Sequence, residues 1–338
     1  MQTLTIPYEN TNIDIHDYLT QTIEHHQKAT PYWQQRLTRG SRTNIAGSNV
    51  EEMLSNLVRL EVDQTVLRSN WLGFKPVATE NMTCSFSSGT TGPQKYCLWA
   101  EHYIQTMANY LHYYISKRHI SVGNAIIQGP SSVFKPVNER MVNKFHGIPY
   151  FVGLRVEGIK PVLDDALKKG QAEIVRVIKD YFAPEIEKTD TFLRNDPSIT
   201  FMRSAWMMLA PFEIFFGDKR NIDTVMVSGL GYTPDNHQML KGKFKNVIHS
   251  YGYFAFGDAL GVEKDGNLDY YPSFPYAIAT VVKDNGEIAD YGQQGHPVFI
   301  IARRDLFLVL KEDKEWAVRV PPTEGFNWDG IRNPYRSV

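Results

Sequence analysis

"CSFSSGTTGPQKYCLW" (residues 84–99) is the stretch of the sequence that most restricts the choice of fold. It places hydroxyl residues, two glycines and one lysine between two cysteine-containing, partly apolar flanks. Glycine admits backbone conformations with φ above zero, so successive amide groups in such a loop can turn inward and form a nest for an anion. The residues expected to line this nest are Ser87, Ser88, Gly89, Thr90, Thr91 and Gly92.

Lys95 adds a mobile positive charge at the end of the same loop. Together with the hydroxyl donors, it makes a polyphosphate a more natural guest than a lone carboxylate. The loop is not a Walker loop, because the pattern of glycine, four residues and Gly-Lys-Ser/Thr is absent. Ordinary polar turns use the same residue types, so a simple connecting loop stays open as the alternative.

The composition is that of a globular protein. The chain has 338 residues, of which 42% are hydrophobic and 22% are charged, enough for one large domain or two ordinary ones. The formal net charge is −1, so no long-range attraction to nucleic acid or to an anionic membrane is expected. A small-molecule or protein partner is favoured, with no nucleic acid and no membrane.

The cysteines and the N-terminal segment point to a cytoplasmic protein. Cys84 and Cys97 are too few for a disulfide framework, and we expect them to be reduced and structural. The N-terminal segment lacks the basic and apolar parts of a leader, and no run approaches the roughly 20 apolar residues that span a bilayer. A soluble, cytoplasmic protein is therefore expected.

Strands and helices are expected to alternate through the middle of the chain. One helical stretch is expected over residues 14–40, with a break near Tyr32 and Trp33. The expected strands are 124–130, 148–154, 221–231 and 245–253, and the expected helices are 138–147, 166–182 and 233–244, the last with Thr233 as its N-cap. This alternation predicts an α/β fold with a largely parallel inner sheet, whose carboxyl-end loops carry the ligand.

From residue 267 onward, short strands and turns replace the alternation, and "DNG" (284–286) is a hairpin signal. No repeat and no linker rich in proline, glycine or serine divides the chain. We expect a single domain over 1–338, with an α/β core over about 60–265 and a β-rich lobe over about 266–325.

Four motifs, in this order, resemble those of the adenylate-forming superfamily: "SSGTTGPQK" (87–95), "VSGLGYTP" (227–234), "HSYGYFAFGD" (249–258) and "ARRDL" (302–306). The superfamily comprises acyl- and aryl-CoA ligases, adenylation domains and luciferases. The phenylacetate-CoA ligase branch and the acyl-protein synthetase of bacterial bioluminescence look nearest. The resemblance spans residues 60–310 and implies the family's large N-terminal-type domain, with parallel inner sheets flanked by helices and a β-rich closing lobe.

The resemblance also implies roles for individual residues. Residues 88–92 would cradle the phosphates of ATP, and Lys95 would steady them. Gly229 would lie against adenine and Tyr251 would stack on it. Gly252 would border the site of the acid carboxylate, which His249 would face, and Asp305 would bind the ribose hydroxyls. Structural alternatives stay open: a bare strand-end turn at Gly229, a core aromatic at Tyr251, an interior histidine at His249, and an ion pair of Asp305 with Arg303 or Arg304.

The sequence departs from the family pattern at the expected Mg²⁺ ligand. Where members of the family place a glutamate, this chain has Phe254 and Ala255, neither of which can bind a hard cation. Asp258 is the nearest substitute, both as a metal ligand and as a catalytic group, and a solvated loop carboxylate is the alternative. The family's C-terminal lid domain, which delivers a catalytic lysine, is expected to be missing.

The stretch 199–217 is rich in methionine and aromatic residues. By resemblance it would wall an acyl pocket, and ordinary core packing is the alternative.

Three functions remain open at this stage. The first is ATP-dependent activation of a small aromatic or aliphatic carboxylic acid as an acyl-adenylate, with transfer to a thiol or amine acceptor such as a carrier protein. The second is a nucleotide-independent acyl hydrolase or acyltransferase acting on a thioester, against which stands the absence of a G-x-S-x-G elbow. The third is a catalytically silent partner subunit that binds a ligand.

Overall fold

The structure is a computed structural model. It describes residues 3–39, 45, 47, 49–77, 82–86, 95–154, 162, 165–166, 168–217, 221–228 and 232–336. The chain divides into two compact units: unit 1 comprises residues 1–86, 95–106 and 253–338, and unit 2 comprises 87–94 and 107–252. These limits differ from the core and lobe expected from sequence, because the first 86 residues belong with the C-terminal strands. Within the described residues, no helix has the length and apolar character needed to cross a bilayer.

Unit 2 is built on a parallel sheet with the strand order β6-β5-β7-β8-β9. The strands are β5 (Asn124–Gly129), β6 (Pro149–Gly153), β7 (Ile199–Ala205), β8 (Thr224–Ser228) and β9 (Asn246–Tyr253). The chain passes from β5 to β6 on one side and returns to β7 on the other. Ligands of such sheets bind where the strand order reverses, so the carboxyl ends of β5 and β7 mark the expected place. The predicted parallel inner sheet is confirmed.

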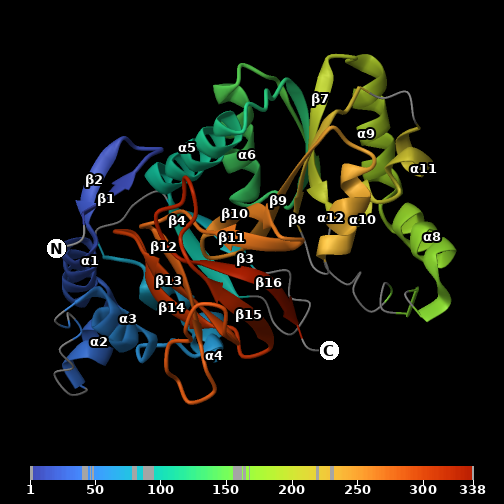
Figure 1. Cartoon of the computed structure of the whole chain (residues 1–338). Coiled ribbons are helices and arrows are strands. Elements are labelled where there is room, and N and C mark those ends of the chain that lie inside the picture. The colour runs from blue at the N-terminus through green and yellow to red at the C-terminus, as the bar shows by residue number, and fades with distance from the viewer. Residues whose placement is uncertain are drawn as a thin grey trace. The chain divides into compact units, whose positions relative to one another are not determined.

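Helices cover both faces of this sheet. They are α6 (Phe134–Lys144), α8 (Gln171–Tyr181), α9 (Ala183–Asn195), α10 (Trp206–Leu209), α11 (Phe212–Phe216) and α12 (Pro234–Lys241), while α5 (Glu101–Lys117) runs from unit 1 into unit 2. Successive residues of β7 face opposite sides, so Met202 packs against α10 and α11 whereas Arg203 lies against Phe134 of α6. Figure 1 shows α6 on one side of β7 and α9 to α11 on the other.

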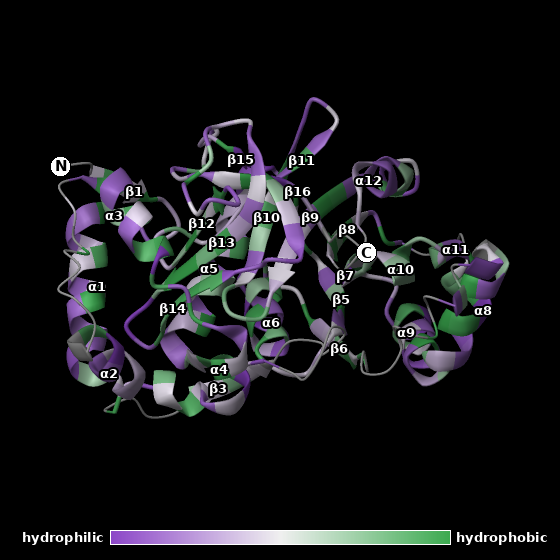
Figure 2. Cartoon of the chain, turned by 90° about the horizontal axis from the view of Figure 1, so that it is seen from below, coloured by the Kyte–Doolittle hydropathy of each residue, from purple (hydrophilic) through white to green (hydrophobic). Residues whose placement is uncertain are grey.

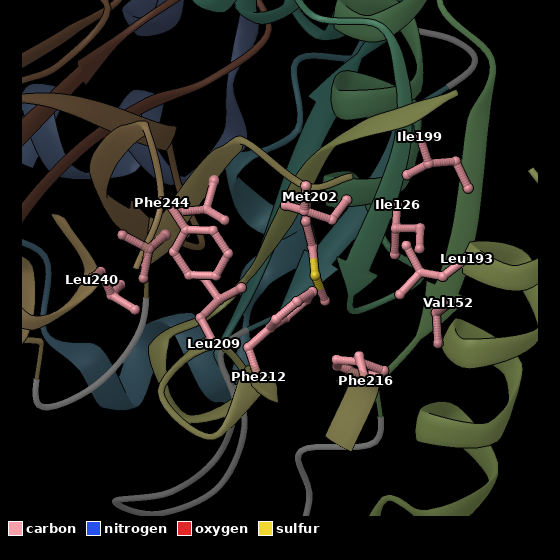
Figure 3. Close-up of a cluster of buried hydrophobic side chains, with 13 residues drawn as sticks. Ile126, Val152, Leu193, Ile199, Met202, Leu209, Phe212, Phe216, Leu240 and Phe244 are labelled. Atoms are coloured by element: carbon pink, nitrogen blue, oxygen red, sulfur yellow. The ribbon is translucent and has the colours of Figure 1, made fainter. Parts of the chain in front are cut away.

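The core of unit 2 lies under α9 to α12 (Figure 3). Its central members include Met202 of β7, Leu209 of α10 and Phe212 and Phe216 of α11, all of them buried. Phe212 also meets Phe244 edge to face, with 5.4 Å between the ring centroids. Several methionine and aromatic residues of 199–217 therefore belong to the core, and the acyl-pocket role of this stretch stays a prediction.

Unit 1 contains the N-terminal elements and the antiparallel strands of the C-terminal half. Its N-terminal elements are β1 (Thr3–Ile6), β2 (Thr11–Asp14), α1 (Ile15–Ala29), α2 (Pro31–Arg39), α3 (Val50–Val58), α4 (Gln64–Ser69), the 3₁₀ helix η1 (Trp71–Phe74), β3 (Met82–Phe86) and β4 (Tyr96–Ala100). Its later strands are β10 (Gly257–Lys264), β11 (Asn267–Tyr271), β12 (Ala277–Val282), β13 (Gln294–Ala302), β14 (Phe307–Lys311), β15 (Glu315–Val320) and β16 (Gly330–Arg336). The pairings of β10 to β16 are antiparallel.

The predicted β-rich lobe is thus confirmed. Strands β12, β13 and β14 are almost fully buried, and hydrophobic residues gather along β12 and β13 in Figure 2. The "DNG" turn follows β12, where Gly286 has a φ of +83° and its amide donates to the carbonyl oxygen of Lys283. That conformation is one that glycine adopts at no steric cost, as the hairpin signal requires.

Three helix boundaries differ from expectation. The stretch 14–40 is two helices, since α1 ends at Ala29 and α2 begins at Pro31, whose ring suits a first helical position. Helix α6 covers 134–144 and not 138–147, because the chain turns at His146, where φ is +62°. Helix α8 begins at Gln171, because Gly170 has a φ of +105° and interrupts the helix expected over 166–182. The N-cap at Thr233 is confirmed, with its hydroxyl accepting from the amide of Asn236 at 3.3 Å.

The core of unit 2 gives a stability prediction. We expect Leu209→Ala to lower the free energy of unfolding by about 2–5 kcal/mol, because this fully buried side chain leaves a cavity. Ile214→Ala, a matched change at a side chain that is 67% exposed, is expected to change it by less than about 0.5 kcal/mol. Urea unfolding of both variants checks this, and equal losses would contradict the assigned core.

Candidate functional site

The loop singled out in the sequence connects a β-hairpin. Strands β3 and β4 pair antiparallel from Met82 with Ala100 to Phe86 with Tyr96, so residues 87–95 form the connection. Its predicted phosphate-binding residues, Ser87 to Gly92, lie outside the described part of the chain. Lys95, at the exit of the loop, is described.

Both cysteines lie on this hairpin and both are free thiols. Burial raises the pKa of the Cys97 thiol to about 12, and the pKa of Cys84 is also raised by burial. A thiol with a raised pKa stays protonated and is a poor nucleophile at neutral pH. Both thiols are free in the structure, and a structural role for the reduced pair stays a prediction.

Strands β3 and β4 are hydrogen-bonded to the turn between β9 and β10. The Ser85 hydroxyl donates to the carbonyl oxygen of Phe254 at 2.6 Å, and the Trp99 indole Nε1 donates to Ser85 Oγ at 2.7 Å. The same indole nitrogen also lies 3.3 Å from the Phe254 oxygen. Strands β3 and β4 and the turn at Phe254, which are far apart in the sequence, therefore contact each other within unit 1.

Lys95 is held in a buried ion pair. Its Nζ lies 3.1 Å from Glu312 Oε1 and 3.3 Å from Gln64 Oε1, and 5.2 Å from the centroid of the Phe254 ring. The Lys95 side chain is 10% exposed and that of Glu312 is 6% exposed. The expectation of a mobile charge was wrong, because the ammonium is desolvated and bonded to a carboxylate and an amide.

Glu312 is itself surrounded by donors. Its Oε1 accepts a hydrogen bond from the Tyr253 hydroxyl, and its Oε2 accepts from Gln64 Nε2 at 3.3 Å. A buried carboxylate is tolerated only when its oxygens are satisfied in this way. Gln64, Lys95, Tyr253 and Glu312 thus form one connected polar cluster in unit 1, named here the Lys95 cluster.

The described residues include no group of three or more histidine, cysteine, aspartate or glutamate side chains that could hold a metal ion. Ala255 is fully buried in the 254–256 turn, and Phe254 is apolar. Asp258 is the second residue of β10 and is 4% exposed, so the alternative of a solvated loop carboxylate was wrong. Mg²⁺ is commonly held by one or two carboxylates together with substrate phosphates and waters, so the metal-binding and catalytic roles of Asp258 stay predictions.

Asp305 is buried and paired. Its Oδ1 lies 3.1 Å from Arg303 Nε, and its Oδ2 accepts from the amide of Ala100 at 2.8 Å. The guanidinium of Arg303 lies over the Tyr103 ring, 4.0 Å from its centroid, and donates to the carbonyl oxygen of Leu98 at 2.6 Å. The pair that the sequence left open as an alternative is therefore present, while the ribose role of Asp305 stays a prediction.

Asp305 and Lys95 lie at opposite ends of β4. Ala100 is the last residue of that strand, and Lys95 directly precedes its first residue. Ala100 is five residue steps from Lys95, which is about 16 Å of extended chain at about 3.3 Å per step.

His249 lies inside unit 2, with 2% of its surface exposed. Its ring meets that of His237 edge to face, with 4.8 Å between the centroids, and the His237 Nδ1 lies 2.7 Å from the Tyr232 hydroxyl. Burial, with smaller contributions from His237 and Arg118, places the pKa of His249 well below its usual value. The imidazole is therefore neutral at pH 7, so it is able to bind a carboxylate by hydrogen bonding but not by charge.

The remaining predicted site residues are Tyr251 and Gly252, near the end of β9, and Gly229, which directly follows the last residue of β8 in the sequence. Tyr251 is half-buried and Gly252 is exposed, so Tyr251 is not the fully buried core aromatic of the alternative. Gly229 lies outside the described residues. The adenine role of Gly229 and Tyr251 and the carboxylate role of Gly252 stay predictions.

Sequence reasoning missed Glu312, Gln64 and Arg203. Glu312 stands in "LKEDKEW", which reads as an exposed charged turn, and nothing local distinguishes it from Asp313. Arg203 is 1% exposed in β7, where its Nη1 donates to Ser250 Oγ at 3.4 Å. An arginine inside an apolar strand could have been recognised from the sequence as a buried, paired charge, because arginine is rarely fully buried unless it is paired.

Comparison with solved structures identifies the fold. The chain is similar to 2-hydroxyisobutyryl-CoA ligase in an open conformation in complex with 2-HIB-AMP and CoA, with a TM-score of 0.65 and 13% identity over 94% of this chain and 72% of that one. The same ligase in its thioesterification state matches with a TM-score of 0.68 and 13% identity, over 95% of this chain and 67% of that one. No family model and no curated protein sequence matches the chain. The resemblance to adenylate-forming enzymes is thus confirmed at the level of the fold.

Buried histidines give a pH prediction. Burial lowers the pKa of His26 to about 4, and the pKa of His249 is lowered as well, so the unfolded chain binds more protons than the folded chain. The stability contributed by keeping these rings neutral is therefore present above the unfolded-state pKa of about 6.5, and it is lost as the pH falls from there toward the lower pKa of the folded state. From pH 7 to pH 5, we expect His26 to lower the free energy of unfolding by about 2 kcal/mol, and His249 to lower it further.

Urea unfolding at the two pH values tests this prediction. His26→Gln is expected to shrink the difference, whereas His102→Gln, at an exposed side chain, is expected to leave it unchanged. Equal or greater stability at pH 5 would contradict the neutral, buried state of these rings.

The buried turn gives a second prediction. Ala255→Glu places a carboxylate where the family has one, but we expect it to destabilise the chain and not to create a metal site, because Ala255 is fully buried. Ala255→Met has a similar volume without the charge. We expect the Glu variant to unfold about 2 kcal/mol more easily than the Met variant. Equal stability with a gain of Mg²⁺-dependent activity would contradict this placement of the turn.

Proposed function

We propose that the chain is an ATP-dependent carboxylate-activating enzyme. In the proposed reaction, an oxygen of the acid attacks the α-phosphorus of ATP in line, the bond between that phosphorus and the bridging oxygen breaks, and pyrophosphate leaves. The acyl-adenylate then passes its acyl group to a thiol or amine acceptor, and AMP is released. The acid is a small aromatic or aliphatic one, and the acceptor is a thiol such as CoA or a carrier protein, or an amine.

One observation carries this proposal. A hydroxyl- and glycine-rich connection with a lysine at its exit closes the β3–β4 hairpin, in a fold shared with a ligase whose structures contain 2-HIB-AMP and CoA. Backbone amides, hydroxyls and an ammonium group are the groups that bind the oxygens of a polyphosphate. A loop of this composition has no evident use in an enzyme that handles only esters.

The proposed roles follow the predicted residues. Residues 87–92 hold the phosphates, and Lys95 contacts the outer ones after it leaves Glu312. Gly229 and Tyr251 contact adenine, while His249 donates a hydrogen bond to the acid carboxylate beside Gly252. For Asp305 to bind the ribose, its carboxylate has to exchange Arg303 and the Ala100 amide for the sugar hydroxyls.

Magnesium enters this proposal bound to ATP, with the buried carboxylate of Asp258 as its protein ligand and as a catalytic group, beside the phosphates. The protein contributes position and charge. It orients the acid and the α-phosphorus, and it places donors where negative charge develops on the leaving pyrophosphate.

The second candidate is a nucleotide-independent acyl hydrolase or acyltransferase. The observation in its favour is the apolar turn at 254–256, where the family's metal ligand is replaced by the buried Ala255. The structure shows no carboxylate at this point, and a reaction without ATP does not require one.

Magnesium-dependent exchange of pyrophosphate into ATP, over a panel of aliphatic and aromatic acids, separates the two functions. We expect exchange with at least one acid, and AMP and pyrophosphate only when acid, ATP and Mg²⁺ are all present. Cleavage of an acyl thioester without nucleotide, surviving the loss of Lys95, would favour the hydrolase. Failure of ATP, AMP and a non-hydrolysable acyl-adenylate mimic to bind at millimolar concentration would end the nucleotide proposal.

Lys95 gives the quantitative prediction. We expect Lys95→Met, which removes the charge but keeps an unbranched side chain, to slow adenylation by a factor that corresponds to about 2–4 kcal/mol, as for the loss of one preorganised charge partner. Triphosphate binding should weaken more than monophosphate binding. Lys28→Met removes an exposed lysine of unit 1 and serves as the control. An unchanged rate in the Lys95 variant, with the fold intact, would remove Lys95 from the site.

A further inference from the structure

The Lys95 cluster places the lysine of the proposed phosphate loop against an internal carboxylate. The ammonium lies 3.1 Å from Glu312 Oε1 and 3.3 Å from Gln64 Oε1, with the Phe254 ring 5.2 Å away. An ammonium group has three donors, and these contacts direct them to an anionic oxygen and an amide oxygen. A nucleotide phosphate offers oxygens of the same kind, so Glu312 and the phosphate compete for one cation.

Lys95 is not the sole hydrogen-bond donor to Glu312. Its Oε1 also accepts from the Tyr253 hydroxyl, and its Oε2 accepts from Gln64 Nε2. A buried carboxylate that lost all its partners would make the exchange prohibitive. Here Tyr253 and Gln64 remain as donors to Glu312 after Lys95 has turned to another anion.

Glu312 is also distinct from its neighbours in the same turn. Asp313, the next residue, has a side chain that is 63% exposed and pairs with Lys311 at 2.8 Å. Its charge is screened by water, and such surface pairs contribute little. The pair inside the Lys95 cluster is shielded from solvent, so its charges act strongly on each other.

We propose that Glu312 is the counter-ion which a polyphosphate must replace at Lys95, and that this exchange sets how strongly the chain prefers a nucleoside triphosphate over a monophosphate. The inference rests on the proposed nucleotide-dependent function. Glu312 is a positioning and specificity residue in this scheme. It contacts no substrate, and it acts only through Lys95.

The test compares two variants with opposite expected effects. Glu312→Gln removes the competing charge, so ATP should bind about tenfold more tightly while AMP binding stays within twofold of wild type. Tyr253→Phe removes a donor that stabilises Glu312 after Lys95 has left, so ATP should bind two- to fivefold more weakly, again with little change for AMP. Asp313→Asn removes an exposed carboxylate from the same turn and should change neither affinity.

Calorimetry with ATP and with AMP measures these affinities, and a purely structural role for Glu312 would weaken both ligands together. Amine labelling of Lys95, read by mass spectrometry, needs no nucleotide: it should become several-fold faster in Glu312→Gln and stay unchanged in Asp313→Asn. If Glu312→Gln does not fold, Tyr253→Phe still carries the test.

The outcomes separate the inference from the function on which it rests. If wild-type protein binds ATP through Lys95 while Glu312→Gln binds ATP no more tightly, or Tyr253→Phe binds it no more weakly, the inference is overturned and the proposed function stands. If wild-type protein binds neither ATP nor AMP, the proposed function fails and the inference fails with it.

Discussion

The carbonyl oxygen of Phe254 accepts a hydrogen bond from Ser85 and lies within reach of the Trp99 indole, and these contacts join the hairpin to the turn that follows β9. The Lys95 ammonium, 5.2 Å from the centroid of the Phe254 ring, lies beside this junction. The junction fixes both strands from which the 87–95 connection extends, and it brings the Phe254 ring over Lys95.

The buried charges of unit 1 extend this arrangement along β4. At the start of the strand, Lys95 is paired with Glu312, and at its end the Ala100 amide is bound by Asp305, which also pairs with Arg303. Buried ion pairs add little net stability, but they strongly penalise the loss of one partner. Two such pairs therefore hold β4 in one position. Each pair also contains a group that the proposed reaction uses, namely Lys95 in one and Asp305 in the other.

The sequence was sufficient to predict the parallel sheet of unit 2 and the short strands that follow residue 267, because both rest on local patterns of apolar residues, whereas strands β1 to β4 were not predicted. The N-cap at Thr233 and the turn at Gly286 were predictable for the same reason. The break at Gly170 was not, since a single glycine inside a helical pattern is often tolerated. Partners distant along the chain left no local signal: Glu312 is 217 residues from Lys95, and its neighbours suggest an exposed turn.

The central claim is that the 87–95 connection binds the phosphates of a nucleotide. Hydrogen–deuterium exchange of the peptide that covers residues 82–100, in the presence and absence of saturating ATP, tests it most directly. The account predicts slower exchange of the amides in 87–94 with ATP, a smaller effect with AMP and none with adenosine. Exchange that is the same with and without ATP, or is slowed equally by adenosine, would contradict it.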